Sequence, residues 1–179
     1  MIANSLTGLR LVLVIPVAWG FAHPDTWPAW WLLALLLIAI ATDMIDGVVA
    51  RRSGTASPAG QLFDHGTDCL FVTAALAGAA YAGSVPWLLP LLVALAFGQY
   101  VVDSRYLHQE RRLLGSLIGR WNGIFYFLPL LIMAAGRLEM LTAAAPTLAV
   151  AAYWLAWMLV ASTLISMIDR AIAPWRRMA

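Results

Sequence analysis

The chain has 179 residues, of which 63% are hydrophobic and 11% are charged. Soluble domains carry about 45–50% apolar and about 25% charged residues, so a core of this size cannot hold all the apolar side chains and most must face lipid. All the basic residues are arginines, the formal net charge is only +2, and no dense basic patch is interleaved with aromatic residues, so we expect no nucleic-acid partner.

Six apolar segments follow one another along the chain, each close to the roughly 20 residues that a membrane-spanning helix needs. In chain order they are 6–22, 27–52, 59–83, 86–102, 114–136 and 146–168. No internal repeat or long linker interrupts them. We therefore predict an all-α fold: one integral membrane domain over residues 1–179, built as a bundle of six transmembrane helices. No small-x-small cleavage site follows the first apolar segment, so we expect that helix to be retained.

The arginines predict how this bundle is oriented. Loops that face the cytoplasm carry an excess of basic residues. With six spans, only Arg137 falls on one side, next to Glu139. The other side receives Arg10, Arg51, Arg52, Arg105, Arg111, Arg112, Arg120, Arg170, Arg176 and Arg177. Both termini are accordingly predicted to be cytoplasmic, in the inner (cytoplasmic) membrane of a cell.

Four of the nine acidic residues lie between positions 43 and 68: Asp43, Asp46, Asp64 and Asp68. A charge inside a spanning helix costs about 2.5–3.5 kcal/mol on insertion scales, so such residues usually carry function. A capping or snorkelling carboxylate, or one partner of a simple ion pair, is an equal explanation for one aspartate alone, but a poor one for four with matched spacing.

The spacing of these aspartates places them on two helix faces. Asp43 and Asp46 are three residues apart and share one face of the second helix, together with the small residues Gly47 and Ala50. Gly60, Asp64 and Asp68 recur every four residues on the third helix. The short connection 53–58 makes the two helices antiparallel neighbours, so the acidic faces can converge.

Four carboxylates in one low-dielectric site repel one another strongly unless a cation compensates them. Arg51 alone cannot neutralise them, whereas divalent metal can. Oxygen ligands without a histidine or cysteine cluster suit Mg²⁺ or Mn²⁺ better than Zn²⁺. Two such ions could clamp a diphosphate, so we predict a metal-dependent enzyme that acts on a diphosphate.

The same residues form a pattern that resembles the CDP-alcohol phosphotransferase family. The signature comprises eight fixed residues over 26 positions and is matched throughout by Asp43, Asp46, Gly47, Ala50, Arg51, Gly60, Asp64 and Asp68. The resemblance implies a transferase of phospholipid synthesis, which cleaves a CDP-alcohol at the cytoplasmic membrane face, moves the phospho-alcohol group to a hydroxyl acceptor and releases CMP. It also suggests a homodimer.

The resemblance also implies a role for each of these residues. Asp43, Asp46 and Asp64 would bind metal, and Asp68 would bind metal or act as the general base that takes the acceptor's proton. The nucleotide and its diphosphate would be bound by Gly47, Ala50, Arg51 and Gly60. The N-terminal residues Asn4, Thr7 and Arg10 resemble the entry to the family's first helix and are candidate nucleotide contacts. They could equally be a helix cap and a cytoplasmic anchor.

The sequence is compatible with two kinds of CDP-linked donor substrate. The segment 57–68 is similar to the version found in choline and ethanolamine phosphotransferases, which use CDP-choline or CDP-ethanolamine with diacylglycerol as acceptor. The length of the chain instead resembles bacterial members that use CDP-diacylglycerol, which we favour. Within this segment His65 is either an accessory base or an interfacial histidine. Further basic candidates for acceptor binding are Arg105, Arg112 and Arg120, which could also be anchors to lipid headgroups.

Two other classes of protein fit part of the pattern. Membrane prenyltransferases also use Mg²⁺ and paired aspartates, but their motifs lie far apart in a larger bundle. Ion or proton transporters carry intramembrane carboxylates but tend to show repeated halves, and no repeat is present in this sequence.

Overall fold

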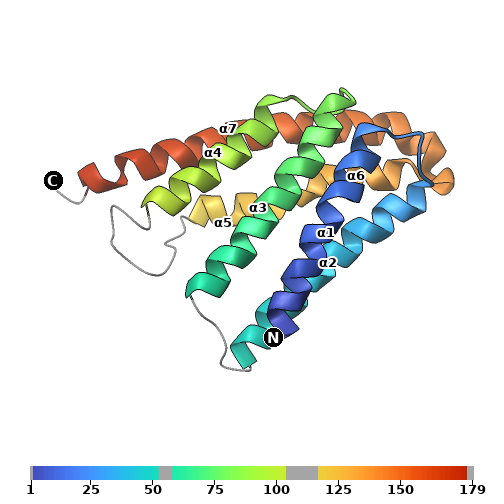
Figure 1. Ribbon diagram of the computed structural model, residues 1–179. Coiled ribbons are helices and arrows are strands. Elements are labelled where there is room, and N and C mark those ends of the chain that lie inside the picture. Colours follow the sequence, from blue (N-terminus) through green and yellow to red (C-terminus); the bar gives the residue numbers. More distant parts are fainter. Residues whose placement is uncertain (1, 53–57, 104–116, 177–179) are drawn as a thin grey trace.

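The computed structural model describes residues 2–52, 58–103 and 117–176, which are helical apart from short turns (Figure 1). Side chains are described for 7–45, 60–103 and 118–172. The described helices are α1 (Ile2–Ala22), α2 (Ala29–Arg52), α3 (Pro58–Tyr81), α4 (Leu88–Val102), α5 (Leu117–Phe125), α6 (Phe127–Gly136), the 3-10 helix η2 (Glu139–Ala144) and α7 (Ala145–Arg176). The predicted all-α fold is confirmed.

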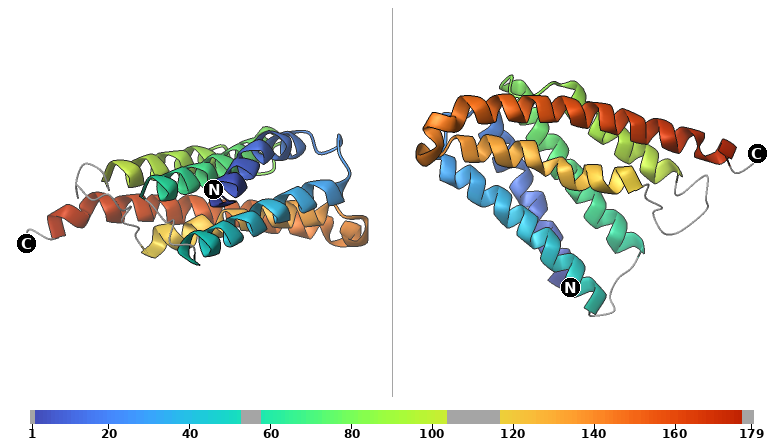
Figure 2. Two further views of the ribbon diagram at one scale, coloured as in Figure 1. Left: turned by 60° about the horizontal axis from the view of Figure 1, so that its bottom comes forward. Right: turned by 180° about the vertical axis from the view of Figure 1, so that it is seen from behind.

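The helices form two layers (Figure 2). Helices α1, α3 and α4 lie side by side in one layer, and α2, the α5–α6 pair and α7 lie in the other. Large apolar side chains close the space between the layers, among them Phe21, Leu36, Phe71 and Leu130, all fully buried. Phe71 of α3 stacks on Phe127 of α6 with ring centroids 6.1 Å apart, which ties the two layers together at mid-height.

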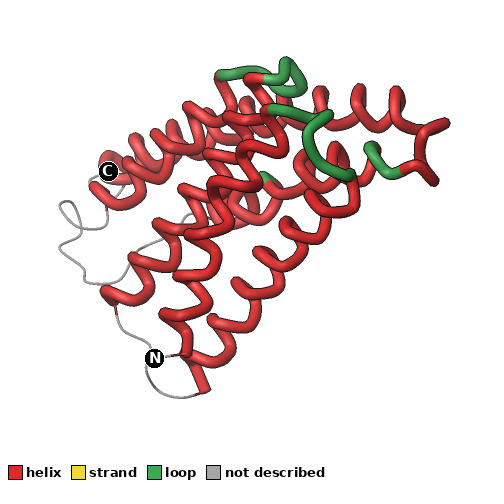
Figure 3. Tube along the Cα trace, turned by 45° about the vertical axis from the view of Figure 1, so that its right-hand side comes forward, coloured by secondary structure: helices red, strands yellow, loops and turns green. Residues whose placement is uncertain are grey.

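The described turns gather at one end of the bundle, away from both termini (Figure 3). The α3–α4 turn shows how sharply the chain reverses there. Gly83 adopts a left-handed φ of 74°, and the amides of Gly83 and Ser84 donate to the carbonyls of Ala80 and Ala79, a Schellman ending that favours glycine at this position. The opposite end holds the start of α1, the end of α2 and the start of α3.

Helices α1 and α3 approach each other closely because α3 has a glycine at the crossing. A Cβ built on Gly78 would lie 2.2 Å from the carbonyl oxygen of Ala18 and 3.2 Å from the amide nitrogen of Ala22. Both are backbone atoms of α1 and cannot turn aside. The α1–α3 spacing, which sets the register of the acidic face of α3 against α1, therefore depends on the missing side chain.

Gly78→Ala is expected to destabilise the bundle by about 1–3 kcal/mol, as overpacking of a close contact usually does. Gly98→Ala is the matched control, because Gly98 lies in helix α4 with open space where its Cβ would be. Alanine there should be neutral or slightly stabilising. Thermal unfolding in detergent measures both variants, and equal midpoints for the two would contradict the close contact.

The expected fifth helix is interrupted. Helix α5 ends at Phe125 and α6 begins at Phe127. Pro129 accounts for the break, because proline has no amide hydrogen for the carbonyl four residues earlier, which is that of Phe125. Polar contacts to α7 surround the interruption: Tyr126 Oη lies 2.8 Å from Thr163 Oγ1, and Ser162 Oγ donates to Asn122 Oδ1 at 2.7 Å.

The outer surface is rich in exposed large apolar side chains on several helices, as expected of a bundle that faces lipid. Two described stretches, Ile118–Gly136 and Glu139–Ile172, are long and apolar enough to cross a membrane. Three described helices are apolar but shorter: Thr7–Ala22, Ala29–Ile45 and Leu88–Val102. The helices expected from the sequence are present, while the number that crosses the membrane and the side on which the termini lie stay predictions.

Candidate functional site

Aspartates from α2 and α3 converge on one arginine of α1. Arg10 Nη2 lies 3.1 Å from Asp43 Oδ1, and Arg10 Nη1 lies 3.2 Å from Asp64 Oδ1. The same Nη1 also donates to Asp68 Oδ1. A single planar guanidinium thus joins α1, α2 and α3, as its forked donors allow. We call Arg10, Asp43, Asp64 and Asp68 the carboxylate cluster.

The cluster is closed beneath the arginine and open above the carboxylates. The side chain of Arg10 is 1% exposed, whereas those of Asp43, Asp64 and Asp68 are 39%, 25% and 26% exposed. The acidic groups can therefore be reached from outside, and the arginine cannot. A fully buried guanidinium is costly unless its charge is balanced, which accounts for its position among carboxylates.

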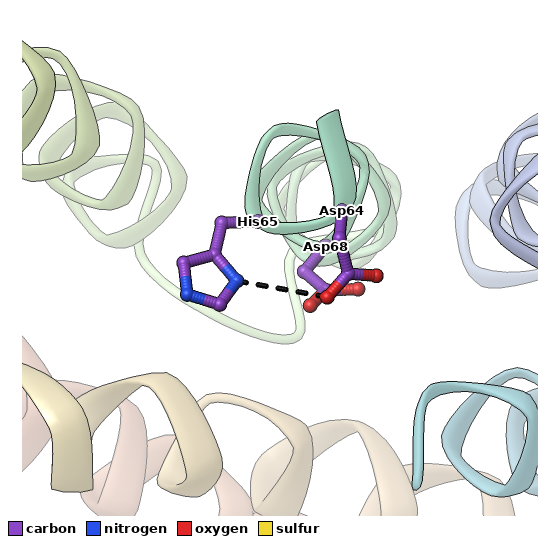
Figure 4. Close-up of side chains that lie close together, drawn as sticks. All are labelled: Asp64, His65 and Asp68. Carbon is purple, nitrogen blue, oxygen red and sulfur yellow. Dashed lines mark ion pairs between the residues drawn. The ribbon is translucent and has the colours of Figure 1, made fainter. Parts of the chain in front are cut away.

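His65 stands at the edge of the cluster. Its Nδ1 lies 3.7 Å from Asp64 Oδ2, and Figure 4 shows its ring to one side of the two carboxylates, with Asp64 and Asp68 pointing the same way from α3. Ligand atoms of Asp64, His65 and Asp68 all lie within 4.8 Å of one another, so these residues could hold a metal ion. An imidazole beside the oxygen donors widens the range of metals that fit.

The remaining predicted site residues are placed less fully. Asp46, Gly47, Ala50 and Arg51 lie on helix α2 beyond Asp43, and Asn4 lies on α1, but the structure describes only their helices. Gly60 is in the first turn of α3, and Thr7 is buried on α1, one turn before Arg10. Arg120 is exposed on α5. Arg105 and Arg112 lie outside the described residues.

The central position of Arg10 was missed by sequence reasoning, which treated it as a nucleotide contact or an interfacial anchor. A signal was present. The buried positions of α1 recur with helical spacing at Thr7, Arg10, Leu13, Val17 and Phe21. A charged residue on the apolar face of a helix is rarely buried without a partner of opposite charge. The spacing along α1 thus indicates that Arg10 is buried and needs an acidic partner, although it does not say which one.

The donor chemistry of the cluster fits divalent metal. Three carboxylates face one guanidinium, so acidic charge is in excess among the described groups. Partly exposed carboxylate oxygens are the ligands that Mg²⁺ and Mn²⁺ take in phosphoryl-transfer sites. The arrangement can therefore bind a cation and, with it, a substrate that carries phosphate.

An apolar two-layer helical bundle with an open acidic cluster at one end defines a membrane-type protein with a candidate metal centre. The chain belongs to the CDP-alcohol phosphatidyltransferase family, which it matches over residues 1–165. The family resemblance drawn from the aspartate pattern is thus confirmed over most of the chain, well beyond the motif itself.

Curated relatives fall in several branches of this family. A CDP-diacylglycerol–glycerol-3-phosphate 3-phosphatidyltransferase from Cereibacter sphaeroides is 33% identical over 105 residues, 58% of this chain and 48% of the relative. A probable phosphatidylglycerophosphate synthase from Mycobacterium tuberculosis is 34% identical over 98 residues, 51% of this chain and 46% of the relative. Cholinephosphotransferase 1 from Gallus gallus is 36% identical over 85 residues, 46% of this chain and 24% of the relative.

The matched region thus spans about half of the two bacterial relatives and about a quarter of the chicken enzyme. No solved structure matches the chain. The comparisons therefore establish the family and leave the donor and the acceptor to the chemistry of the site.

Proposed function

We propose that this protein is a metal-dependent CDP-alcohol phosphotransferase of phospholipid synthesis. It transfers a phosphatidyl group from CDP-diacylglycerol to a hydroxyl acceptor and releases CMP. The observation that carries the proposal is the convergence of Asp43, Asp64 and Asp68 from two helices on one small, open site. Membership of the family supports the reaction class.

The carboxylates have distinct roles in this proposal. Asp43, Asp46, Asp64 and Asp68 hold one or two Mg²⁺ or Mn²⁺ ions, and His65 lies close enough to Asp64 to assist. When bound, the ions offset the charge that develops on the diphosphate as its bridging bond breaks. The nucleotide and its diphosphate are bound by Gly47, Ala50, Arg51 and Gly60. Additional nucleotide contacts are proposed for Asn4, Thr7 and Arg10.

Asp68 is the proposed general base. It accepts the proton of the acceptor hydroxyl, whose oxygen forms a new bond to the phosphorus that carries the alcohol group. The bond between that phosphorus and the bridging oxygen breaks, and CMP leaves with the electron pair. Asp68 lies on α3 with its carboxylate 26% exposed, so an acceptor can reach it from outside the bundle.

A second donor is also supported by specific observations. The segment 57–68 is similar to that of choline and ethanolamine phosphotransferases, and a cholinephosphotransferase is among the relatives. CDP-choline or CDP-ethanolamine, with diacylglycerol as acceptor, is therefore the alternative. An ion or proton transporter, which the sequence left open, has no such support, because the family match extends over residues 1–165.

The proposal also places the protein in the cell. We propose a single domain over residues 1–179 in the cytoplasmic membrane, with both termini and the carboxylate cluster on the cytoplasmic side. The asymmetric distribution of arginines supports this orientation. Acceptor contacts fall to Arg105, Arg112 and Arg120 on the same side, and a homodimer is the proposed assembly.

The test is a comparison of donors. Purified protein in detergent with Mn²⁺ is offered CDP-diacylglycerol, CDP-choline and CDP-ethanolamine, each with candidate acceptors, and released CMP is measured. We expect CMP from CDP-diacylglycerol. Release from CDP-choline or CDP-ethanolamine alone would select the alternative, and consumption of none of the three would overturn the proposed function. Asp64→Asn provides the background rate.

A further inference from the structure

The charged group at the centre of the carboxylate cluster is Arg10, not an aspartate. Its two terminal nitrogens contact Asp43 on α2 and both Asp64 and Asp68 on α3, while its own side chain is 1% exposed. Each of these three contacts joins Arg10 to a helix other than its own. Arg10 is therefore placed to hold the acidic faces of α2 and α3 together.

The carboxylates that Arg10 contacts include Asp64 and Asp68, which together with His65 could hold a metal ion. Oδ1 of Asp43, Asp64 and Asp68 all face the guanidinium. A guanidinium and a divalent cation repel each other across the few ångströms of this cluster, and the low dielectric of the interior strengthens that repulsion. Both cations cannot keep full contact with the same oxygens at the same time.

We infer that Arg10 is the internal counterion of the cluster and that divalent metal binds there in competition with it. Metal binding requires the guanidinium to move off the carboxylates, Asp68 among them. Arg10 is thus a positioning residue with two effects: it stabilises the bundle when metal is scarce, and it lowers the affinity of the site for metal. The inference rests on the proposed metal-dependent function.

The competition also bears on where Arg10 lies once metal is bound. Because Arg10 is anchored on α1, its displaced guanidinium stays beside the site. There the diphosphate of the substrate can take the place of the carboxylates as its ion-pair partner. The proposed contact of Arg10 with the nucleotide and its observed contact with the aspartates then belong to two steps of one cycle.

The test uses Arg10→Gln, which removes the charge and keeps a polar side chain of similar reach. Mn²⁺ binding to purified protein is measured by electron paramagnetic resonance, and thermal unfolding is measured in chelator and in Mn²⁺. We expect Arg10→Gln to bind Mn²⁺ about tenfold or more tightly than wild type, because a competing ion pair worth at least one factor of ten is gone. We also expect it to unfold much earlier in chelator and to be restored by Mn²⁺.

Arg137→Gln is the matched control. Arg137 is also partly buried, donates to the Gly20 carbonyl at 2.9 Å and lies over the Phe21 ring at 5.5 Å, far along α1 from the cluster. Its loss should lower the unfolding midpoint equally with and without Mn²⁺ and leave Mn²⁺ affinity unchanged. Arg10→Lys keeps the charge without the fork, so its affinity and its stability in chelator should lie between those of wild type and Arg10→Gln.

The outcomes separate this inference from the function on which it rests. Suppose that wild type binds Mn²⁺, that Asp64→Asn does not, and that both Arg10 variants bind Mn²⁺ no more tightly than wild type. This result would contradict the competition between Arg10 and metal but would still support the metal site. Wild-type protein that binds no Mn²⁺ would overturn the metal site itself. If Arg10→Gln folds only when purified in Mn²⁺, that requirement supports the counterion role, and Arg10→Lys supplies the affinity comparison.

Discussion

Asp64→Asn is expected to reduce CMP release by at least roughly a thousandfold, which corresponds to about 4 kcal/mol of lost transition-state stabilisation. Asparagine has nearly the same shape as aspartate, so the site keeps its volume and loses one negative charge and one metal ligand. Arg10 retains its contacts with Asp43 and Asp68, so the three helices should stay together. The measurement is the rate of CMP release with the preferred donor in saturating Mn²⁺.

The matched control for this prediction is Asp25→Asn. Asp25 is exposed in the turn before α2. Helix α2 begins at Ala29, which is itself roughly 20 Å along the helix from Asp43 at about 1.5 Å per residue. This variant should turn over at the wild-type rate. The assignment of Asp64 as a metal ligand would be wrong if Asp64→Asn unfolds at the wild-type midpoint and still releases CMP at more than a tenth of the wild-type rate.

The convergence of the acidic helix faces was predictable because local rules determine it. Asp43 and Asp46 recur at helical spacing on one helix, and Asp64 and Asp68 do so on the next. The connection between the two helices is too short for anything but antiparallel neighbours. The structure brings Asp43, Asp64 and Asp68 together, as the spacing predicts, but it does so on an arginine that the spacing did not indicate. Residue spacing within a helix and the length of a connection can both be read directly from a single sequence, so structure that depends on them is the easiest to predict.

The role of Arg10 was harder to predict because its partners lie 33 to 58 residues away along the chain. Its contact depends on the packing of α1 against α3, which rests on Gly78 and the backbone of Ala18. Helical spacing can show that Arg10 lies on the buried face of α1. It cannot show which helix that face meets.

The interruption at Tyr126 was missed for a different reason. The segment 114–136 is predicted as a single span, but it contains Pro129, and proline removes a backbone hydrogen bond to the residue four before it. Membrane helices tolerate such breaks where neighbouring polar groups satisfy the backbone. Near this break the bonds are between side chains: Tyr126 pairs with Thr163 and Asn122 with Ser162, which joins the interrupted helix to α7.

Chelation of divalent metal is expected to abolish CMP release completely and leave wild-type protein folded. Removing metal leaves Asp43, Asp64 and Asp68 without their proposed cations, but Arg10 can still offset part of their charge. The unfolding midpoint in chelator should therefore fall only modestly, and added Mg²⁺ or Mn²⁺ should restore turnover in the same sample. Loss of activity with retained fold assigns the metal to chemistry rather than to structure.

Arg10→Gln makes this distinction sharper, because it removes the internal cation as well. In chelator this variant keeps the acidic groups of α2 and α3 without either kind of counterion, and mutual repulsion among neighbouring carboxylates destabilises the packing of the two helices. As chelator removes the metal, the wild-type protein should lose turnover and stay folded. Arg10→Gln should lose turnover and its folded state together. Full turnover by wild-type protein shown by elemental analysis to be free of metal would contradict the metal-dependent reaction, whatever the stability of either protein.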